Sequence, residues 1–352
     1  MHNGSRLCGS LGSVNVKNSP DAPSVCILGL GLIGGSLLRD LTAAGFNAYG
    51  WNRSESTVRA ATADGYDVTG NLEDVLVRAR EDNALLVLGV PMPALDSLLG
   101  AIAEHAPECG LTDVTSVKAP VLERVRAHGL EARFVGGHPM AGTADSGWKA
   151  TMHGLFDGAV WVVAHDNAPI GSAGQAPSRA NPWTKTWHAV VDMAHAAGAV
   201  VVPAHAKNHD RAVARISHLP HIVAETVAIG GDLGGPLALS LAASSFRDAT
   251  RVAGTEPHLV RAMCENNREG LVEALDEAVE LIRQAREDLA SGGTVRGLTE
   301  DGFAARGRFE ARAGRSKGDA TNRPIFNVHP GKPRWISQLD AAEQAGAEIT
   351  II

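Results

Sequence analysis

The feature that most constrains this chain is a long alternation, from Val25 to Val202, of short apolar runs with amphipathic segments. Short, nearly continuous apolar runs are typical of parallel strands covered on both faces, and the segments between them have helical character. The predicted strands are Val25–Leu30, Phe46–Trp51, Leu85–Val90, Leu111–Val114, Phe134–Val135, Ala159–Ala164 and Ala199–Val202. We therefore predict an α/β fold built on a doubly wound, mostly parallel sheet.

The strand pattern stops after Pro203, and helices are predicted at 205–230, 236–245, 256–264 and 266–290. In the last of these, apolar residues from Leu271 to Leu289 recur every three or four positions and form one stripe. Such a stripe needs a partner helix, either within the chain or across a dimer interface. The segment Ile222–Ile229 is apolar nearly all round, which predicts a buried central helix. The second half is thus predicted to be an all-α dimerisation domain.

These patterns divide the chain into four segments: a flexible N-terminal arm at 1–23, a dinucleotide-binding domain at 24–203, a helical dimerisation and substrate domain at 204–290, and a C-terminal extension of unassigned role at 291–352. The end of the extension, from Ile325, could form a strand, a helix and a final strand. The proline-rich segment His165–Trp183 has no periodicity, so we interpret it as a surface insertion rather than an active-site lid.

Charge, hydropathy and cysteine spacing argue against several classes of protein. The chain has 32 Lys and Arg against 39 Asp and Glu, a net charge of −7, which argues against nucleic-acid and anionic-membrane binding. No run approaches the ~20 apolar residues of a membrane span, and the start of the chain lacks an apolar signal core. Cysteines 8, 26, 109 and 264 show no disulfide-like spacing, as expected for a cytoplasmic protein.

A glycine-rich motif follows the first predicted strand and opens a helix. Its residues are Gly29, Leu30, Gly31, Leu32, Ile33 and Gly34. In this strand–turn–helix context the glycines allow a tight turn and a close backbone approach, so that a pyrophosphate meets the unpaired N–H groups of the helix N-terminus. The pattern predicts a Rossmann-type nucleotide site; the alternative is a glycine-rich turn without a ligand.

The end of the second predicted strand bears on the choice of cofactor. An acidic residue there would favour NAD, but this chain has Asn52, Arg53 and Ser54. The Arg53 guanidinium suits a 2′-phosphate, so NADP is favoured over NAD, although an asparagine can also serve the ribose hydroxyl. Val90 and Pro91 lie at the end of the predicted strand Leu85–Val90, at the ligand-binding edge, and are predicted to form a wall of the cofactor site.

His138 stands out among the 14 histidines because its segment, Gly136–Thr143, directly follows the predicted strand Phe134–Val135 and contains flanking glycines. A neutral imidazole there could accept a proton from a substrate hydroxyl; the alternative is a histidine that braces the loop. Ser116, at the end of another strand, could cap the next helix or hydrogen-bond both substrate and His138. We interpret Lys118 as a surface residue of the first helical turn rather than as a catalytic group.

The helical half carries polar groups in apolar surroundings, in Ser217–His221 and Phe246–Arg251. Pro220 should kink its helix. The pairs His218/His221 and His205/His209 have helical spacing that could hold a metal, but no Cys or carboxylate completes a set, so we expect no metal. Arg251, if buried, needs an anion, either Asp248 or a substrate carboxylate.

Together these motifs resemble the prephenate/arogenate dehydrogenases of tyrosine biosynthesis. They occur in order between about residue 24 and about residue 290, as GLGLIGGS, Ser116-Val117-Lys118, GHPMAGT ending at Thr143, SHLPH and FRDATR. The resemblance implies an NAD(P)-dependent oxidative decarboxylation of prephenate or arogenate to 4-hydroxyphenylpyruvate or tyrosine, in a homodimer, with hydride passing from ring C4 to the nicotinamide.

The resemblance also implies the roles of individual residues. His138 would deprotonate the C4 hydroxyl, Ser116 would orient that hydroxyl, and Arg251 would hold a carboxylate. Thr143, His218 and His221 would line the substrate pocket. It does not separate prephenate from arogenate.

Two other functions remain open from the sequence. One is a β-hydroxyacid dehydrogenase-type NADP oxidoreductase, which shares a Rossmann half and a helical dimer domain but releases no CO2 in its reaction. The other is a catalytically dead nucleotide-sensing regulator, which would bind cofactor without turnover.

Overall fold

The computed structural model describes residues 24–143, 145–169, 180–313 and 321–352. The predicted N-terminal arm, Cys8 and the centre of the segment His165–Trp183 lie outside these residues. In the described part of that segment, Asn181 caps the helix that comes after it, because its side chain accepts from the N–H groups of Trp183 and Thr184.

The main sheet has six parallel strands in the order β3-β2-β1-β4-β5-β6. Its strands are β1 (Val25–Leu28), β2 (Ala48–Trp51), β3 (Val68–Thr69), β4 (Leu85–Leu88), β5 (Leu111–Asp113) and β6 (Phe134–Val135). The connecting helices are α1 (Leu32–Ala43), α2 (Glu55–Ala63), α3 (Leu72–Glu81), α4 (Leu95–His105) and α5 (Ala119–Ala127). This strand order is that of a Rossmann domain and confirms the predicted fold class.

Both faces of the main sheet are covered, as its apolar strands require. Val25 and Ile27 of β1 join a core cluster with α1 and with α6 (Pro182–Ala196), whereas Cys26 and Leu28 join a second cluster with α3, α4 and α5. Successive side chains of a strand point to opposite faces, so a strand buried on both sides must be apolar throughout.

The three strands that follow β6 do not extend the main sheet. They are β7 (Gly137–Pro139), β8 (Val160–Ala164) and β9 (Val200–Ala204), and they form a separate sheet in which β7 runs antiparallel to β8 and β8 parallel to β9. His138 is therefore the middle residue of a strand, paired with Val162, and not part of a loop. The prediction missed β7 because its sequence, Gly-His-Pro, has little strand propensity.

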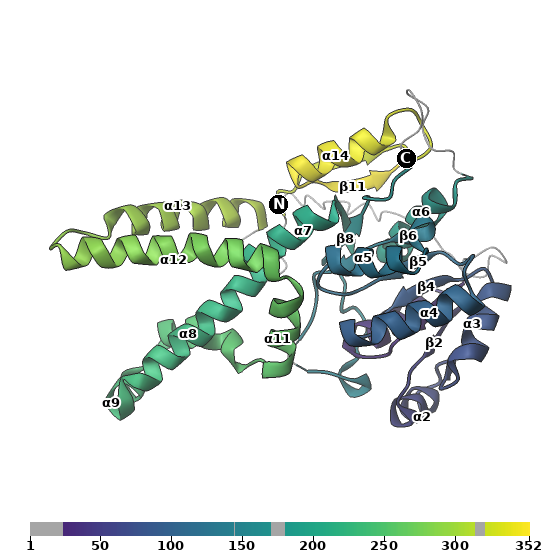
Figure 1. Cartoon of the computed structure of the whole chain (residues 1–352), viewed down its shortest axis with the longest axis horizontal. Coiled ribbons are helices and arrows are strands. Elements are labelled where there is room, and N and C mark those ends of the chain that lie inside the picture. Colours follow the sequence, from purple (N-terminus) through teal and green to yellow (C-terminus); the bar gives the residue numbers. More distant parts are fainter. Residues whose placement is uncertain (1–23, 144, 170–179, 314–320) are drawn as a thin grey trace, which may run out of the picture.

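The end of the chain forms the expected strand, helix and strand: β10 (Ile325–Val328), α14 (Trp335–Ala345) and β11 (Glu348–Ile351). This C-terminal module packs on β9, and Trp335 joins the main core at 5.1 Å between its ring centroid and that of Trp187 on α6. Figure 1 shows the module, in yellow, at the top of the molecule. It is an integral layer of the structure and not an appendage.

The helical part begins with α7 (Ala206–Val213), a π-helical turn (Ala214–His218) and α8 (Leu219–Leu233), which continue one another. It goes on with α9 (Gly235–Leu241), α10 (Ser244–Thr250), the 3-10 helix η6 (Arg251–Gly254), α11 (Pro257–Asn266), α12 (Arg268–Ala290) and α13 (Arg296–Ala313). Pro220 has no N–H to give the carbonyl of Ile216, which accounts for the irregular turn at the predicted kink.

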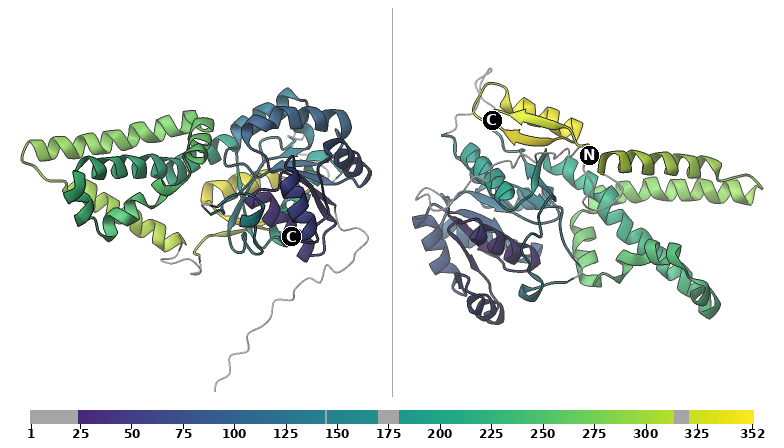
Figure 2. Two further views of the ribbon diagram at one scale, coloured as in Figure 1. Left: turned by 90° about the horizontal axis from the view of Figure 1, so that it is seen from below. Right: turned by 180° about the vertical axis from the view of Figure 1, so that it is seen from behind.

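Two predictions about the helices are corrected. The segment Ile222–Ile229 is not buried, because Ile229 is 61% exposed and only Ala224 of α8 is buried. Helix α13 is absent from the predicted helices, since residues 296–313 are polar and glycine-interrupted and have no apolar stripe. The α8–α9 and α12–α13 pairs project from one side of the sheets (Figures 1 and 2).

Within the described residues, no single helix is long and apolar enough to span a membrane; only the bent pair Ala206–Leu233 and Gly235–Leu241 meets that test together, by length and composition alone.

Candidate active site

The glycine-rich turn between β1 and α1 has the shape of a pyrophosphate cradle. Gly29 has φ of +113°, and a Cβ there would lie 2.4 Å from the carbonyl oxygen of Gly89. A Cβ on Gly34 would lie 2.0 Å from the carbonyl oxygen of Gly29, whereas a Cβ on Gly31 would meet no atom within 4 Å. The first and third glycines are thus needed for packing, and the second opens on free space at the α1 N-terminus. The N-cap residue, Gly31, has no side chain to cap that terminus, so its N–H groups are available to an anion.

The other predicted cofactor residues lie at the same edge of the sheet. Val90 is adjacent to the turn, because its Cγ1 would be 2.9 Å from a Cβ on Gly29. Arg53 and Ser54 are exposed after β2, and Arg53 forms no ion pair within the described part of the chain. An exposed, unpaired guanidinium at this place fits a phosphate on the adenosine ribose.

A chain of hydrogen bonds runs from His138 into the helical part. His138 Nδ1 lies 2.8 Å from His209 Nε2, and His209 Nδ1 lies 2.7 Å from Asp210 Oδ1. An ionised carboxylate can only accept, so His209 must carry its proton on Nδ1 and accept through Nε2. His138 then carries its proton on Nδ1, which leaves the lone pair of His138 Nε2 for another group. The network thus selects the tautomer of His138 that a proton acceptor needs.

The surroundings of these rings favour their neutral forms. Burial lowers the pKa of His138 well below its ordinary value of 6.5, and the nearby His209 and Lys118 lower it further. Burial also lowers the pKa of His209, against the opposing effect of Asp210. Both rings are therefore neutral near pH 7, as the tautomer chain requires.

Asp210 has a second task. Its carboxylate accepts the backbone N–H groups of Lys118, at 2.7 Å, and Ala119, at 2.8 Å, and so caps the N-terminus of α5 from another helix. The predicted capping role of Ser116 is therefore wrong. Ser116 is half-buried beyond β5, and the described residues include no hydrogen bond between it and His138.

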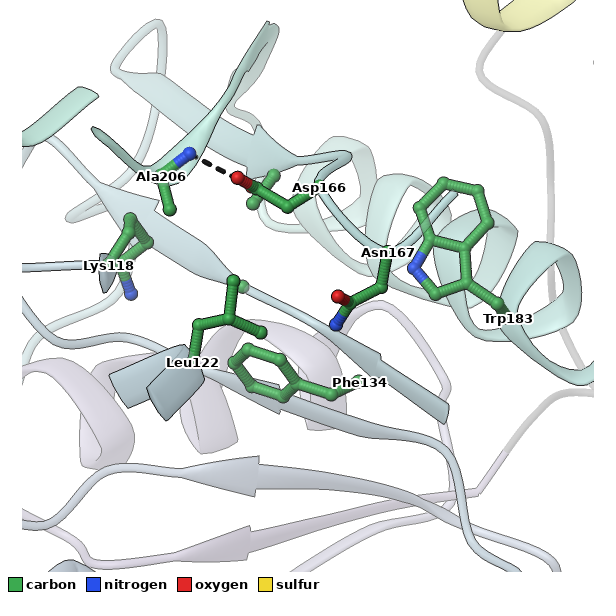
Figure 3. A pocket seen from close by; sticks show the side chains of 9 residues that line it. Lys118, Leu122, Phe134, Asp166, Asn167, Trp183 and Ala206 are labelled. Atoms are coloured by element: carbon green, nitrogen blue, oxygen red, sulfur yellow. Dashed lines mark hydrogen bonds between the residues drawn. The ribbon is translucent and has the colours of Figure 1, made fainter. Parts of the chain in front are cut away.

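Lys118 is not the surface residue that the sequence suggested, since it is only 2% exposed. Its Nζ pairs with Asp113 and donates to the carbonyl oxygen of Gly137 at 2.6 Å, while the Gly137 N–H donates to Asp113 Oδ1 at 3.1 Å. Both backbone groups of the residue before His138 are thus held. Lys118 positions β7 and lines a small cavity shared with Asp166 and Ala206 (Figure 3).

The SHLPH histidines face different surroundings. His218 is buried, with Nδ1 3.1 Å from the amide nitrogen of Asn267, and burial lowers its pKa to about 4. The Asn267 amide also donates to the Asp210 carbonyl oxygen at 2.7 Å, so His218 belongs to the same network. One turn further, His221 has a buried Nδ1 without a hydrogen-bond partner in the described residues.

The remaining candidates lie nearer the surface. Arg251 opens η6, which packs on α8; it is exposed rather than buried and forms no ion pair with Asp248 within the described residues. Thr143 is exposed and accepts from the Asp145 N–H at 3.2 Å. The protomer alone therefore leaves the Arg251 guanidinium available to an anion.

His209, Asp210 and Asn267 are parts of the site that the sequence did not indicate. The spacing of His205 and His209 suggests only a metal pair, but the two rings have different partners: His209 contacts His138, and His205 contacts Glu343. Nothing in the local sequence links residues 138 and 209, because only the tertiary fold brings β7 against α7.

Two family models match separate parts of this chain. Residues 37–170 match the family model for the nucleotide-binding domain of prephenate dehydrogenase, and residues 205–299 match that for its dimerization domain. A prephenate dehydrogenase of Lactococcus lactis is 30% identical over 72% of this chain and 67% of its own.

Solved structures are similar as well. A candidate prephenate dehydrogenase from Corynebacterium glutamicum is 51% identical, with a TM-score of 0.87 over 94% of this chain and 99% of its own. The prephenate dehydrogenase of Aquifex aeolicus, in complex with hydroxyphenyl propionate and NAD+, is 22% identical, with a TM-score of 0.70 over 83% of this chain and 100% of its own, a likeness of fold.

Proposed function

Because the chain belongs to the prephenate dehydrogenase family and is a dehydrogenase, we propose that it catalyses the NAD(P)-dependent oxidative decarboxylation of prephenate, with His138 as the base. The observation that carries the proposal is the Asp210–His209–His138 chain of hydrogen bonds, which leaves a free lone pair on a neutral imidazole. The family's chemistry requires a group that removes a hydroxyl proton, and this imidazole is suited to it.

In the proposed reaction His138 Nε2 takes the proton of the ring C4 hydroxyl. A nicotinamide cofactor bound at the Gly29–Gly34 turn supplies the hydride acceptor. The imidazolium formed at His138 is stabilised by the lone pair of His209 and, through it, by the charge of Asp210. Loss of CO2 makes the ring aromatic, which favours the reaction. The protein then needs only to hold the base, the substrate carboxylate and the cofactor close together in the correct orientation.

The substrate contacts that we propose are Ser116 and Thr143 from the Rossmann part and His218, His221 and Arg251 from the helical part. Arg251 would hold a substrate carboxylate, because its guanidinium is exposed and has no anion of its own in the described part of the chain. Arg251 opens η6, which packs on α8, the helix that carries His221.

Replacement of Arg251 by glutamine is expected to raise KM for the substrate by about 10-fold or more, the usual worth of a charge-assisted hydrogen bond, while KM for the cofactor stays within about twofold. Steady-state kinetics with each reactant varied in turn measure both constants. Arg247→Gln removes a neighbouring exposed arginine of α10 and serves as the control. Equal increases in the KM for substrate and the KM for cofactor would indicate that Arg251 supports the folded structure and does not bind the substrate.

For the cofactor we propose NADP rather than NAD, on the exposed guanidinium of Arg53. Arg53→Ala is expected to raise KM for NADP by about 10-fold and KM for NAD by less. The reason is that the variant lacks the guanidinium that would pair with the 2′-phosphate, a group that only NADP has. Arg59→Ala, on α2 and paired with Glu55 at 3.2 Å, is the matched control. A larger effect on NAD than on NADP would refute the assignment.

We propose that the active form is a homodimer through the helical part. Apolar side chains at the far ends of α8, α9 and α12 are exposed in the protomer: Ile229, Leu233, Leu237, Leu241, Ile282 and Leu289. Their burial by a second copy would stabilise the pair, since apolar surface that a protomer leaves exposed favours association. The match of residues 205–299 to a dimerization domain supports this proposal.

The proposed activity is tested by an assay of prephenate and of arogenate, each with NADP and with NAD, that follows reduced cofactor and released CO2 together. With prephenate we expect one molecule of CO2 to be released for each molecule of cofactor reduced. Turnover with arogenate alone would transfer the same mechanism to the amino substrate. Cofactor reduction without CO2 would favour a β-hydroxyacid dehydrogenase, and cofactor binding without turnover of either substrate would favour a nucleotide sensor.

A further inference from the structure

Four polar side chains meet where the C-terminal module packs on the start of α7, away from the glycine-rich turn. His165 follows β8, His205 immediately precedes α7, and Asp340 and Glu343 lie one turn apart on α14. The His165 and His205 rings are 4.0 Å apart between centroids. Neither the cofactor site nor the proposed proton transfer uses any of these residues.

We propose that His165, His205 and Asp340 bind a divalent metal ion of the zinc type. One ligand atom from each lies within 4.8 Å of the other two. Asp340 Oδ1 is 3.1 Å from His165 Nε2 and 3.9 Å from His205 Nε2. Tetrahedral zinc with bonds of 2.0–2.1 Å sets neighbouring ligand atoms about 3.3 Å apart, so an ion fits after only small side-chain movements.

Glu343 completes the environment of this ion. Its Oε2 lies 2.7 Å from His205 Nδ1, and its Oε1 accepts the His205 N–H at 2.9 Å. A carboxylate that accepts from the far nitrogen of a ligating histidine orients the ring and increases its basicity. Glu343 Oε2 is also 3.7 Å from His165 Nε2, which places it near enough to become a fourth ligand.

Charge and burial favour an ion at this place. Metal ligation requires neutral imidazoles, and with both rings neutral the two carboxylates give the cluster a formal charge of −2, which a divalent ion balances. The His165 side chain is fully buried, so water does not compete for its Nε2. Imidazole nitrogen with carboxylate oxygen is a donor set that suits zinc and its transition-metal neighbours.

A metal ion at this site would give the C-terminal module a role, because it would link α14 to His205, the residue immediately before α7. The next residue, Ala206, is already held by its N–H bond to Asp166 at 2.9 Å (Figure 3). His209 and Asp210 lie one turn further along α7. The metal ion would therefore fix the start of the helix that carries two residues of the His138 hydrogen-bond network. The sequence indicates no carboxylate for His205, because Glu343 is 138 residues away.

The proposal is tested on the full-length chain without a histidine tag, stripped with a chelator and titrated with zinc sulfate in a calorimeter. One zinc per chain and a higher Tm in its presence are expected. Asp340→Asn should weaken zinc binding at least about 10-fold and remove the rise in Tm, because the amide is a poor ligand. If Asp340→Asn does not fold, His205→Gln, at a 40% exposed side chain, tests the same site.

The matched control is Asp96→Asn, which removes a surface carboxylate 3.6 Å from a single histidine, His128, and should bind zinc as the unchanged protein does. Cobalt gives a second readout, since a tetrahedral site with imidazole ligands produces visible absorption bands that Asp340→Asn should lose. The absence of saturable zinc binding, or an equal zinc affinity in the unchanged protein and Asp340→Asn, would contradict the proposal. The cluster would then contain only histidine–carboxylate hydrogen bonds and no metal site.

Discussion

Replacing His138 with asparagine is expected to lower kcat by roughly 10²- to 10⁴-fold, the usual contribution of a general base. Asparagine fits the place of the imidazole in β7 and can still hydrogen-bond, but it cannot take up a proton. The cofactor turn, on β1 and α1, does not involve this side chain, so cofactor affinity should stay within about twofold. The effect should therefore fall on kcat rather than on binding.

The measurement is steady-state kinetics with prephenate, combined with cofactor titration by protein fluorescence. His128→Asn, the same change at a partly exposed histidine of the α5 C-terminus, is the control and should leave kcat unaltered. A normal kcat in His138→Asn would remove His138 from the role of base.

Asp210→Asn is expected to lower kcat by roughly 10²-fold, although Asp210 does not itself face the substrate. An amide in place of the carboxylate no longer forces the His209 proton onto Nδ1, so both rings can adopt the tautomer that blocks His138 Nε2. Loss of tautomer control of this kind costs up to ~10⁴-fold in the serine proteases, where the carboxylate orients the base directly. We expect less here because a second imidazole lies between.

The same change should also lower Tm, because an asparagine oxygen cannot replace both acceptors of the Lys118 and Ala119 N–H groups. A pH profile separates the two effects. Removing the negative charge lowers the pKa of His138, so the acid limb of kcat/KM should move to lower pH. A residue with only a structural role would reduce stability without moving that limb.

Much of the fold can be predicted because its signals are local. The Rossmann sheet follows from apolar runs such as Val25–Leu30, and the cofactor turn from glycines whose spacing has a steric reason. The place of His138 just beyond the carboxyl end of β6 has a similar basis, because a strand that ends at Val135 delivers the next few residues to that side of the sheet. The strand–helix–strand at the C-terminus is also visible in the periodicity.

The features that escape prediction depend on contacts between distant segments. The buried state of Lys118 requires Asp113 and Gly137 to surround it, and the partner of His138 lies 71 residues away on α7. The expected burial of Ile222–Ile229 fails for a related reason: apolar composition indicates that a helix must be covered, but not whether its own chain covers it. The exposure of Arg251 is likewise set by the packing of η6 and not by its neighbours in the sequence.

The most direct test of the account is the pH dependence of kcat/KM for prephenate, measured from pH 5 to pH 9. The pKa of His138 is lowered, so its neutral form persists as the pH falls through 6.5, and activity should decline only below that pH. In His138→Asn the acid limb should disappear from the residual rate. An acid limb at or above pH 6.5, or one that persists in His138→Asn, would contradict a neutral imidazole at His138 as the proton acceptor.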